Sequence, residues 1–346
     1  MRRHFTAFRG GGEVDFGYGS TEGFAPLRER LQQMLQERMI AVEPGGLLLT
    51  HGANHALDLV IRQFLEPGDT VFVDEPGYYP LFAKLTLAKV RMVGIRRGDD
   101  GPDLEDLTQK LPLHRPKLFF TQSQAHNPTG TSLTPAVAFA LVHASEDWGF
   151  RIVEDDAFGD IVPPSMPRLA ALGRLDRVLY VGSFSKTLSA SLRTGFVAAH
   201  PSLIGHLRDI KMVTTVATSD LVERFVLNLI QEGHYLRHLR RLRSRLAKEW
   251  AATLAGLAEF APLPITAPGL GYYLWLPLPS AIDEADLCRR AASKGIFVAP
   301  GSVFYPQRSN RHPPAIRINV AYGADPSFLA LLAEAFGVRR TPAPDR

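Results

Sequence analysis

The chain has 346 residues, of which 45% are hydrophobic, and this is enough apolar material for a large core and roughly two domains. Its net charge of +4 is far below that of a nucleic-acid-binding surface, so direct nucleic-acid binding is not expected, whereas an anionic small molecule would suit it. The single cysteine, Cys288, excludes an internal disulfide and a cysteine-based metal cluster, and the 11 histidines lack metal-ligand spacing.

Short runs of β-branched and aromatic residues alternate with helical stretches in the first part of the chain. The predicted strands are Leu47–Thr50, Val71–Asp74, Val90–Ile95, Leu118–Thr121, Ile152–Glu154, Val178–Val181 and Phe196–Ala198. Between them, Asn54–Phe64 and Pro135–Trp148 carry apolar residues at helical spacing. This alternation predicts an α/β/α sandwich around a largely parallel sheet with right-handed crossovers.

The pattern changes after residue 200. Helical stretches without strands fill the chain from Pro201 to about Leu257. The elements predicted next are a strand at Tyr272–Leu276, a helix at Glu284–Lys294, strands at Phe297–Ala299 and Ile316–Val320, and a helix at Pro326–Phe336. We therefore expect a large domain over residues 15–238 and a smaller C-terminal α+β domain over 239–346 that includes part of an interdomain helix.

The ends of the chain and its apolar runs bear on its location. Residues 1–14 are predicted to be disordered or the remnant of an N-terminal arm. No apolar run approaches the roughly 20 residues that span a bilayer, and no signal-peptide core follows the first residues. The sequence thus predicts a cytoplasmic protein without membrane contact. The basic run Arg237–Arg245, within a predicted helix, is interpreted as a solvated face.

Polar groups follow several predicted strands, and ligands of doubly wound sheets bind at the carboxyl ends of the strands. His51-Gly52-Ala53-Asn54 comes after the first strand and opens a helix, where free amides and the helix dipole favour a phosphate. Capping of the helix by Asn54 is an equally good explanation of this tetrapeptide alone.

Two further strand ends carry an amide and carboxylates. Asn127 lies in the rigid turn His126–Gly130, which ordinary turn chemistry also explains. Glu154-Asp155-Asp156 places three carboxylates together, where they repel one another. One of them stays ionised if it pairs with a buried cation such as a pyridinium nitrogen. The alternative is that one caps a helix and the others are solvated.

Lys186 follows the strand Val178–Val181, in the sequence Gly182-Ser183-Phe184-Ser185-Lys186, and Arg193 comes seven positions later. A lysine at the end of a buried strand is costly unless it is exposed, paired or covalently used. An amine beside hydroxyls and a cation is suited to hold an aldehyde cofactor as a Schiff base while its phosphate is bound. Arg317 alternates with apolar residues on a later strand and would bind a carboxylate or form an ordinary salt bridge.

Together, in this order, these residues resemble the fold-type I, pyridoxal-phosphate-dependent aminotransferases of class I and II, from about Asp15 to Gly337. The resemblance implies that Lys186 is the Schiff-base lysine and that Asp155 pairs with the pyridinium nitrogen. It also implies that Asn127 lies beside the cofactor phenolate and contacts substrate, and that Arg317 binds the substrate carboxylate. The residues implied to contact the phosphate are Gly52, Ala53, Asn54, Ser183 and Arg193.

Two tyrosines complete the implied site. Tyr78, in Glu75-Pro76-Gly77-Tyr78, resembles the catalytic aromatic residue that stacks on the cofactor ring. Tyr18 resembles the tyrosine that reaches the phosphate of the neighbouring subunit, so the resemblance implies a homodimer with shared active sites. The chain is most similar to the aminotransferase-like domain of MocR-type regulators of the GntR family, but without residues for their DNA-binding domain.

The chain departs from the family pattern in two places. Ala157 and Phe158 stand where a tyrosine usually donates to the cofactor phenolate, and the usual N-terminal arm before Asp15 is short or missing. The leading hypothesis is amino transfer from an L-amino acid to a 2-oxo acid. The alternatives are a ligand-sensing regulatory domain with little turnover and a pyridoxal-phosphate-dependent lyase.

Overall fold

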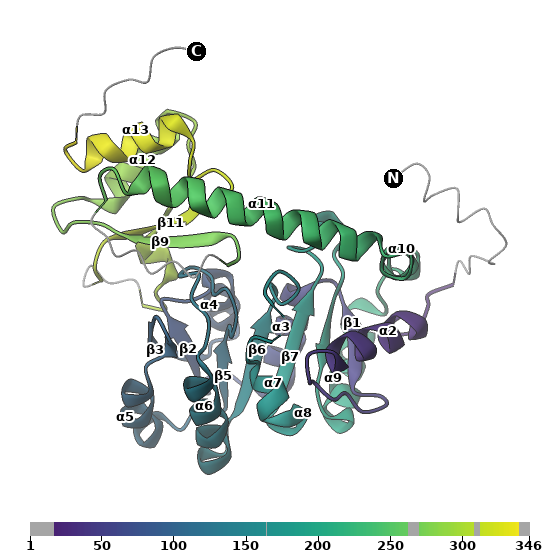
Figure 1. Ribbon diagram of the computed structural model, residues 1–346. Coiled ribbons are helices and arrows are strands. Elements are labelled where there is room, and N and C mark those ends of the chain that lie inside the picture. The colour runs from purple at the N-terminus through teal and green to yellow at the C-terminus, as the bar shows by residue number, and fades with distance from the viewer. Residues whose placement is uncertain (1–16, 164, 262–269, 308–311, 339–346) are drawn as a thin grey trace.

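The computed structural model describes residues 17–163, 165–261, 270–307 and 312–338 (Figure 1). Residues 1–14, predicted to be disordered or a remnant arm, lie outside the described part of the chain. Among the described residues, no helix combines the length and the apolar character needed to cross a membrane.

The large sheet is mostly parallel, as predicted. Its strand order is β1-β8-β7-β6-β5-β2-β3-β4, where β2, β3, β5, β6 and β7 pair in parallel and β8 runs antiparallel to both of its neighbours. The strands are β1 (Leu47–Thr50), β2 (Thr70–Glu75), β3 (Arg91–Gly98), β4 (Gly101–Pro102), β5 (Leu118–Thr121), β6 (Arg151–Asp156), β7 (Val178–Ser183) and β8 (Gly195–Ala198).

Helices cover both faces of this sheet, because its strands are apolar on both sides. Leu47 and Leu49 of β1 pack into the cluster on one face, whereas Leu48 between them packs into the cluster on the other. The first face carries α2 (Ala25–Gln36), α5 (Leu104–His114), α6 (Pro135–Trp148), α7 (Leu169–Leu172), α8 (Arg174–Arg177) and α10 (Asp220–Gln231). The second carries α3 (Ala53–Phe64), α4 (Tyr79–Leu87) and α9 (Pro201–Thr215).

The long helix α11 (His234–Leu257) extends from the large sheet to a second, smaller unit (Figure 1). There β9 (Tyr273–Pro277), β10 (Ala299–Pro300) and β11 (Ala315–Asn319) form an antiparallel sheet covered by α12 (Glu284–Ser293) and α13 (Pro326–Ala335). The predicted strand Phe297–Ala299 overlaps β10 only at Ala299. The Phe297 side chain is 90% exposed and does not join the core of the small unit. The predicted boundary after residue 238 falls inside α11 and stays a prediction.

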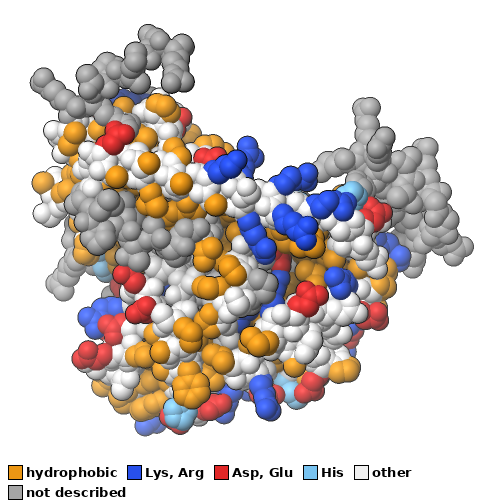
Figure 2. All heavy atoms as spheres, in the orientation of Figure 1, with side chains coloured by type: hydrophobic (Ala, Val, Ile, Leu, Met, Phe, Trp, Pro, Cys, Tyr) orange, Lys and Arg blue, Asp and Glu red, His pale blue; other side chains and the backbone are white. Residues whose placement is uncertain are grey.

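Lysine and arginine side chains gather along α11 on the face shown in Figure 2. The exposed ones are Arg237, Arg240, Arg241, Arg245 and Lys248. Arg243 is half-buried instead and donates from Nη2 to the backbone oxygen of Asp160 at 2.7 Å. The predicted basic face is therefore in contact with solvent in a single chain.

A buried lysine attaches the segment before α2 to the large sheet. Lys211 of α9 is fully buried and donates from Nζ to the backbone oxygens of Thr21 at 2.6 Å and Leu49 at 2.8 Å. It also donates to Thr218 Oγ1 at 3.2 Å, and burial lowers the pKa of its amine to about 8. Leu49 lies on β1, directly before the turn at Gly52, so this one side chain connects the segment that follows Tyr18 to the sheet.

Replacing Lys211 with methionine removes the donor to the buried carbonyl group of Leu49 and the partly buried one of Thr21, while keeping most of the side-chain volume. We expect Lys211→Met to lower the free energy of unfolding by about 3 kcal/mol, because unpaired buried acceptors are costly. Urea denaturation measures the change. The control, Lys248→Met on the exposed face of α11, should change it by less than about 0.5 kcal/mol, and equal losses in both variants would contradict the role of Lys211.

Candidate active site

The carboxyl ends of β1, β2, β5, β6 and β7 share one edge of the large sheet, since these strands run in the same direction. Asp155 lies in the last part of β6, and Gly52, Tyr78, Asn127 and Lys186 follow the carboxyl ends of β1, β2, β5 and β7. This edge faces α11 and the small sheet (Figure 1). The structure thus gathers at one place the side chains that the sequence singled out from distant segments.

The turn after β1 forms an anion-binding helix start. Gly52 is the N-cap residue of α3 and has a φ of 75°, a conformation that favours glycine. Within the described chain, no side chain forms a capping hydrogen bond at this end of the helix. Helix α3 begins at Ala53, so Asn54 lies inside its first turn and is not the cap. The backbone amides at this end therefore remain suited to an anion.

Arg193 is held against the same turn. It lies in the left-handed region with a φ of 48° and donates from Nη2 to the backbone oxygen of His51 at 3.1 Å. Its Nη1 donates to Ser185 Oγ at 3.3 Å, and Ser183 Oγ in turn accepts from the Ser185 amide at 3.2 Å. A cation, two hydroxyls and a helix start thus lie together, which is the arrangement expected for a phosphate.

Gly195 of β8 allows this arrangement, and sequence reasoning did not select it. A Cβ atom added to Gly195 would lie 2.7 Å from the Cα of Gly52 and 2.8 Å from the backbone oxygen of Gly182. Only a residue without a side chain permits such a close approach of β8 to the turn after β1. A glycine inside a predicted strand was the available signal for this site.

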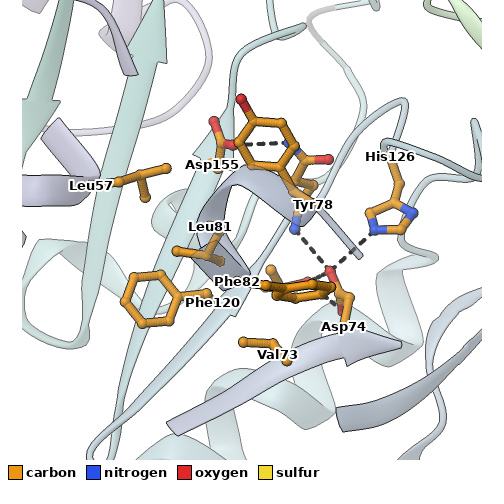
Figure 3. A pocket seen from close by; sticks show the side chains of 11 residues that line it. Leu57, Val73, Asp74, Tyr78, Leu81, Phe82, Phe120, His126 and Asp155 are labelled. Atoms are coloured by element: carbon orange, nitrogen blue, oxygen red, sulfur yellow. Dashed lines mark hydrogen bonds and ion pairs between the residues drawn. The ribbon is translucent and has the colours of Figure 1, made fainter. Parts of the chain in front are cut away.

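Asp155 is a buried carboxylate with one oxygen in use. Its Oδ2 accepts from Gln122 Nε2 at 2.9 Å, whereas Oδ1 is buried and has no hydrogen-bond partner within the described chain. Burial raises the pKa of Asp155 to about 6, although the hydrogen bond from Gln122 opposes this shift. Tyr78 and Asp155 line the same pocket (Figure 3). The free oxygen is suited to a cationic partner.

The two neighbouring carboxylates have other partners. Glu154 accepts from the amides of Leu169 at 3.0 Å and Ala170 at 2.8 Å, so it caps α7, and burial raises its pKa to about 7. Asp156 is 3% exposed and pairs with Arg168 Nε at 2.8 Å. Helix capping by one member is thus seen, but solvation of the others is not. Asp155 and Asp156 each keep an Oδ1 without a hydrogen-bond partner among the described residues, but Asp156 is already paired with a cation, whereas Asp155 accepts from the neutral amide of Gln122.

Arg317 joins the small sheet to the turn after β5. Its Nη1 donates to Asn127 Oδ1 at 2.8 Å. Its guanidinium carbon lies 4.2 Å from the ring centre of Tyr273 and 5.0 Å from that of Phe304. The structure therefore brings the two residues expected at the substrate together across 190 positions of sequence. Aromatic faces on the cation fix its position without neutralising it.

Lys186 is exposed, and its backbone oxygen accepts from the Tyr272 hydroxyl at 2.7 Å. Phe158 is buried, and its ring centre lies 6.1 Å from that of Tyr272 and 6.0 Å from that of Tyr273. It therefore packs between the large and small units. Tyr18 stands apart from this cluster, because its side chain is 84% exposed in a single chain. Its predicted contact with the phosphate of a neighbouring subunit stays a prediction.

Comparison with known proteins identifies the class. The fold is that of LysN, the α-aminoadipate aminotransferase of Thermus thermophilus, solved with N-(5′-phosphopyridoxyl)-L-leucine, at a TM-score of 0.88 and 29% identity over 97% of this chain and 87% of that one. The chain belongs to the aminotransferase class I and II family, whose model matches residues 9–336.

Curated relatives include an enzyme and a regulator. The 2-aminoadipate transaminase of Thermus thermophilus is 34% identical over 85% of this chain and 74% of its own length. The uncharacterised HTH-type transcriptional regulator YdfD of Bacillus subtilis is 29% identical over 89% of this chain, which spans 64% of that protein. The predicted similarity to both aminotransferases and this kind of regulator is thereby confirmed.

The cofactor of this family is pyridoxal 5′-phosphate, and the residues present fit it. The uncapped start of α3 and the Arg193 guanidinium match its phosphate. The unpartnered Oδ1 of Asp155 matches its protonated ring nitrogen, because a buried carboxylate needs a cation or a donor. Lys186 supplies an exposed amine at the same edge of the sheet.

Introducing a methyl group at Gly195 should disrupt this site. We expect Gly195→Ala to push the turn at Gly52 out of place, lower the free energy of unfolding by about 1–3 kcal/mol and weaken pyridoxal phosphate binding. Denaturant titration and a binding titration measure the two effects. The control is Gly205→Ala on α9, where an added Cβ meets nothing within 4 Å and helix propensity favours alanine. Normal binding by the Gly195 variant would be the contrary result.

Proposed function

We propose that the chain transfers an amino group from an L-amino acid to a 2-oxo acid with pyridoxal 5′-phosphate. The observation that supports this most is the unpartnered carboxylate oxygen of Asp155, buried at the sheet edge that also carries Lys186 and the anion-binding turn. When bound, the cofactor supplies an aldehyde for the amino group and a ring that accepts the electron pair of the bond broken at the substrate Cα.

The phosphate would be bound by the amides of Ala53 and Asn54 after Gly52, together with Ser183 and Arg193. Asp155 would hold the proton on the ring nitrogen, since an ionised carboxylate favours the protonated form. Tyr78, which shares a pocket with Asp155, would lie against the ring. Asn127, whose Oδ1 faces Arg317, would keep its side-chain amide for the cofactor or the substrate.

Lys186 would act as the base that takes the proton from the substrate Cα and moves it to the C4′ atom of the cofactor. Arg317 would bind the α-carboxylate, because its planar guanidinium offers two parallel donors. This contact fixes the substrate and so determines which bond at Cα is aligned for cleavage.

A homodimer with shared sites is part of the proposal. Besides Tyr18, exposed apolar side chains lie at the end of α9, at the start of α10 and between them, namely Met212, Val213, Val216 and Leu221. A Cβ at Gly19 would lie 3.6 Å from the Cβ of Asp220, so these segments adjoin. Such a surface, with Tyr18 projecting from it, suits a second copy of the chain.

The second candidate is a ligand-sensing regulatory domain that binds the cofactor and an amino acid with little turnover. Similarity to the regulator YdfD and the phenylalanine at position 158 favour it. The same residues would bind the cofactor in this case. A lyase would also use them, and analysis of the products distinguishes it from a transferase.

Lys186→Ala should abolish both the visible absorbance of the protein with pyridoxal phosphate and its amino-transfer activity, because the amine is lost. Absorbance spectra and a coupled assay with an amino-acid panel measure this, with Lys248→Ala as the control. Normal transfer by the Lys186 variant would refute the mechanism. In the wild-type chain, repeated turnover with an oxo acid indicates an enzyme, whereas a spectral change that stops after amino-acid addition indicates a sensor.

Phe158→Tyr restores a hydroxyl that could reach the cofactor phenolate. Because a donor stabilises the ionised phenolate, we expect the variant to shift the pH midpoint of the cofactor absorbance to lower pH. A spectrophotometric titration of the loaded protein measures the midpoint. Phe184→Tyr, at another buried phenylalanine that packs against Tyr235, is the control and should leave it unchanged. An identical midpoint in the Phe158 variant would contradict this role.

A further inference from the structure

Gln122 directly follows β5 and belongs to none of the motifs described so far. It is 5% exposed and lines the same pocket as Tyr78 and Asp155. Most buried polar atoms of side chains have a hydrogen-bond partner. The partners of this amide are therefore informative.

Both ends of the Gln122 side chain are in use. Its Nε2 donates to Asp155 Oδ2 at 2.9 Å, and its Oε1 accepts from the backbone amide of Asn127 at 2.8 Å. The carboxylate accepts and the backbone amide donates, so only one orientation of the side-chain amide satisfies both. Gln122 thus joins the two residues proposed to contact the ring of the cofactor.

The backbone of Gln122 is fixed as well. Its amide donates to Asp74 Oδ2 at 3.2 Å, and its backbone oxygen accepts from Arg97 Nη2 at 3.0 Å. Asp74 and Arg97 themselves form a buried ion pair at 3.1 Å. The glutamine is therefore anchored at four polar groups, and its side chain holds Asp155 from a rigid base.

The charge of Asp155 depends on this contact. Burial raises the pKa of Asp155 to about 6, and the hydrogen bond from Gln122 is the strongest effect that opposes the rise. Removing this donor would move the pKa upward, toward neutral pH. Asp155 would then be protonated in a larger share of molecules and would not pair with a cationic ring nitrogen.

The other ionisable groups around the pocket would not give the same pH dependence of cofactor binding when Gln122 is replaced. Burial holds the pKa of His126 well below its ordinary value, and that of Tyr78 above its ordinary value, so both stay neutral near pH 7. Asp74 is paired with Arg97, and Asp156 with Arg168. Glu154, whose pKa is about 7, accepts from the amides of α7, which a change at Gln122 leaves in place.

We propose that Gln122 is a positioning residue that keeps Asp155 ionised and leaves its Oδ1 for the ring nitrogen of pyridoxal phosphate. This inference rests on the proposed function. It adds a residue that acts through Asp155 and touches neither the cofactor nor the substrate. Its signature is a dependence on pH, because loss of a merely structural contact would weaken cofactor binding equally at every pH.

The test measures the affinity of the full chain for pyridoxal phosphate from about pH 5 to about pH 9, a range that includes the protonation of Asp155. Gln122→Met keeps the length of the side chain and removes the donor. Asp155 must be ionised to bind, so the affinity of the wild-type chain falls as the pH drops through about 6. The variant should show this fall at higher pH, with binding about tenfold weaker at pH 7 and nearly normal at pH 9.

Gln124→Met is the matched control. Gln124 is a buried glutamine two positions away, but its Nε2 donates to the backbone oxygen of Pro167 and not to Asp155. The Gln124 variant should have the same pH midpoint of binding as the wild-type chain. Because the cofactor phosphate titrates equally in both variants, any difference between them comes from the protein. Gln122→Glu retains an acceptor for Asn127 while adding negative charge beside Asp155, so it should shift the midpoint in the same direction as Gln122→Met.

The outcomes are distinguishable. A midpoint that moves upward in both Gln122 variants and stays in the control supports the inference. A loss of affinity that is equal at all pH values, or no loss, overturns it while leaving the proposed function intact. If Gln122→Met does not fold, Gln122→Glu decides by the same criterion. A wild-type chain that binds no pyridoxal phosphate at any pH overturns the proposed function and this inference with it.

Discussion

The burial of three successive carboxylates at the end of β6 is the constraint on which the site depends. Like charges at this spacing repel one another, and burial adds to the cost of ionising each of them. Each of two carboxylates has its own partner: Glu154 accepts from a backbone amide at the start of α7, and Asp156 pairs with the guanidinium of Arg168. Both aspartates keep an Oδ1 without a hydrogen-bond partner among the described residues, but Asp156 is already paired with Arg168, so Asp155 is the carboxylate suited to a further cation.

The large sheet could be predicted because its strands are apolar on both faces and lie between amphipathic helices. β1 and β5 coincide with the predicted strands Leu47–Thr50 and Leu118–Thr121. In the small sheet, the predicted strand Phe297–Ala299 overlaps the two-residue β10 only at Ala299, and the Phe297 side chain is exposed to solvent. Helix α2 was not predicted, because it precedes the first strand and its burial depends on distant leucines of the sheet.

Candidate site residues could be selected from the sequence where one residue type at a strand end has a clear chemical use, as for Lys186 and Asp155. They could not be selected where a residue matters through contacts between distant segments. Gly195 is needed because β8 crosses beside Gly52, and Gln122 is informative because of the groups at both ends of its amide. In the sequence these are an ordinary glycine and an ordinary glutamine. Asn54, by contrast, was a reasonable cap until the structure placed it inside α3.

The contact between Arg317 and Asn127 has a consequence for the choice of ligand. The guanidinium is already enclosed by two aromatic rings and bonded to a neutral amide, so little side-chain entropy is left to lose when an anion arrives. A ligand carboxylate can replace Asn127 as the acceptor and form a charge-assisted hydrogen bond with the guanidinium, whereas a simple monoamine has no acceptor to replace the amide oxygen. Discrimination between amino acids and their decarboxylated counterparts would thus be built into the resting conformation of the cleft.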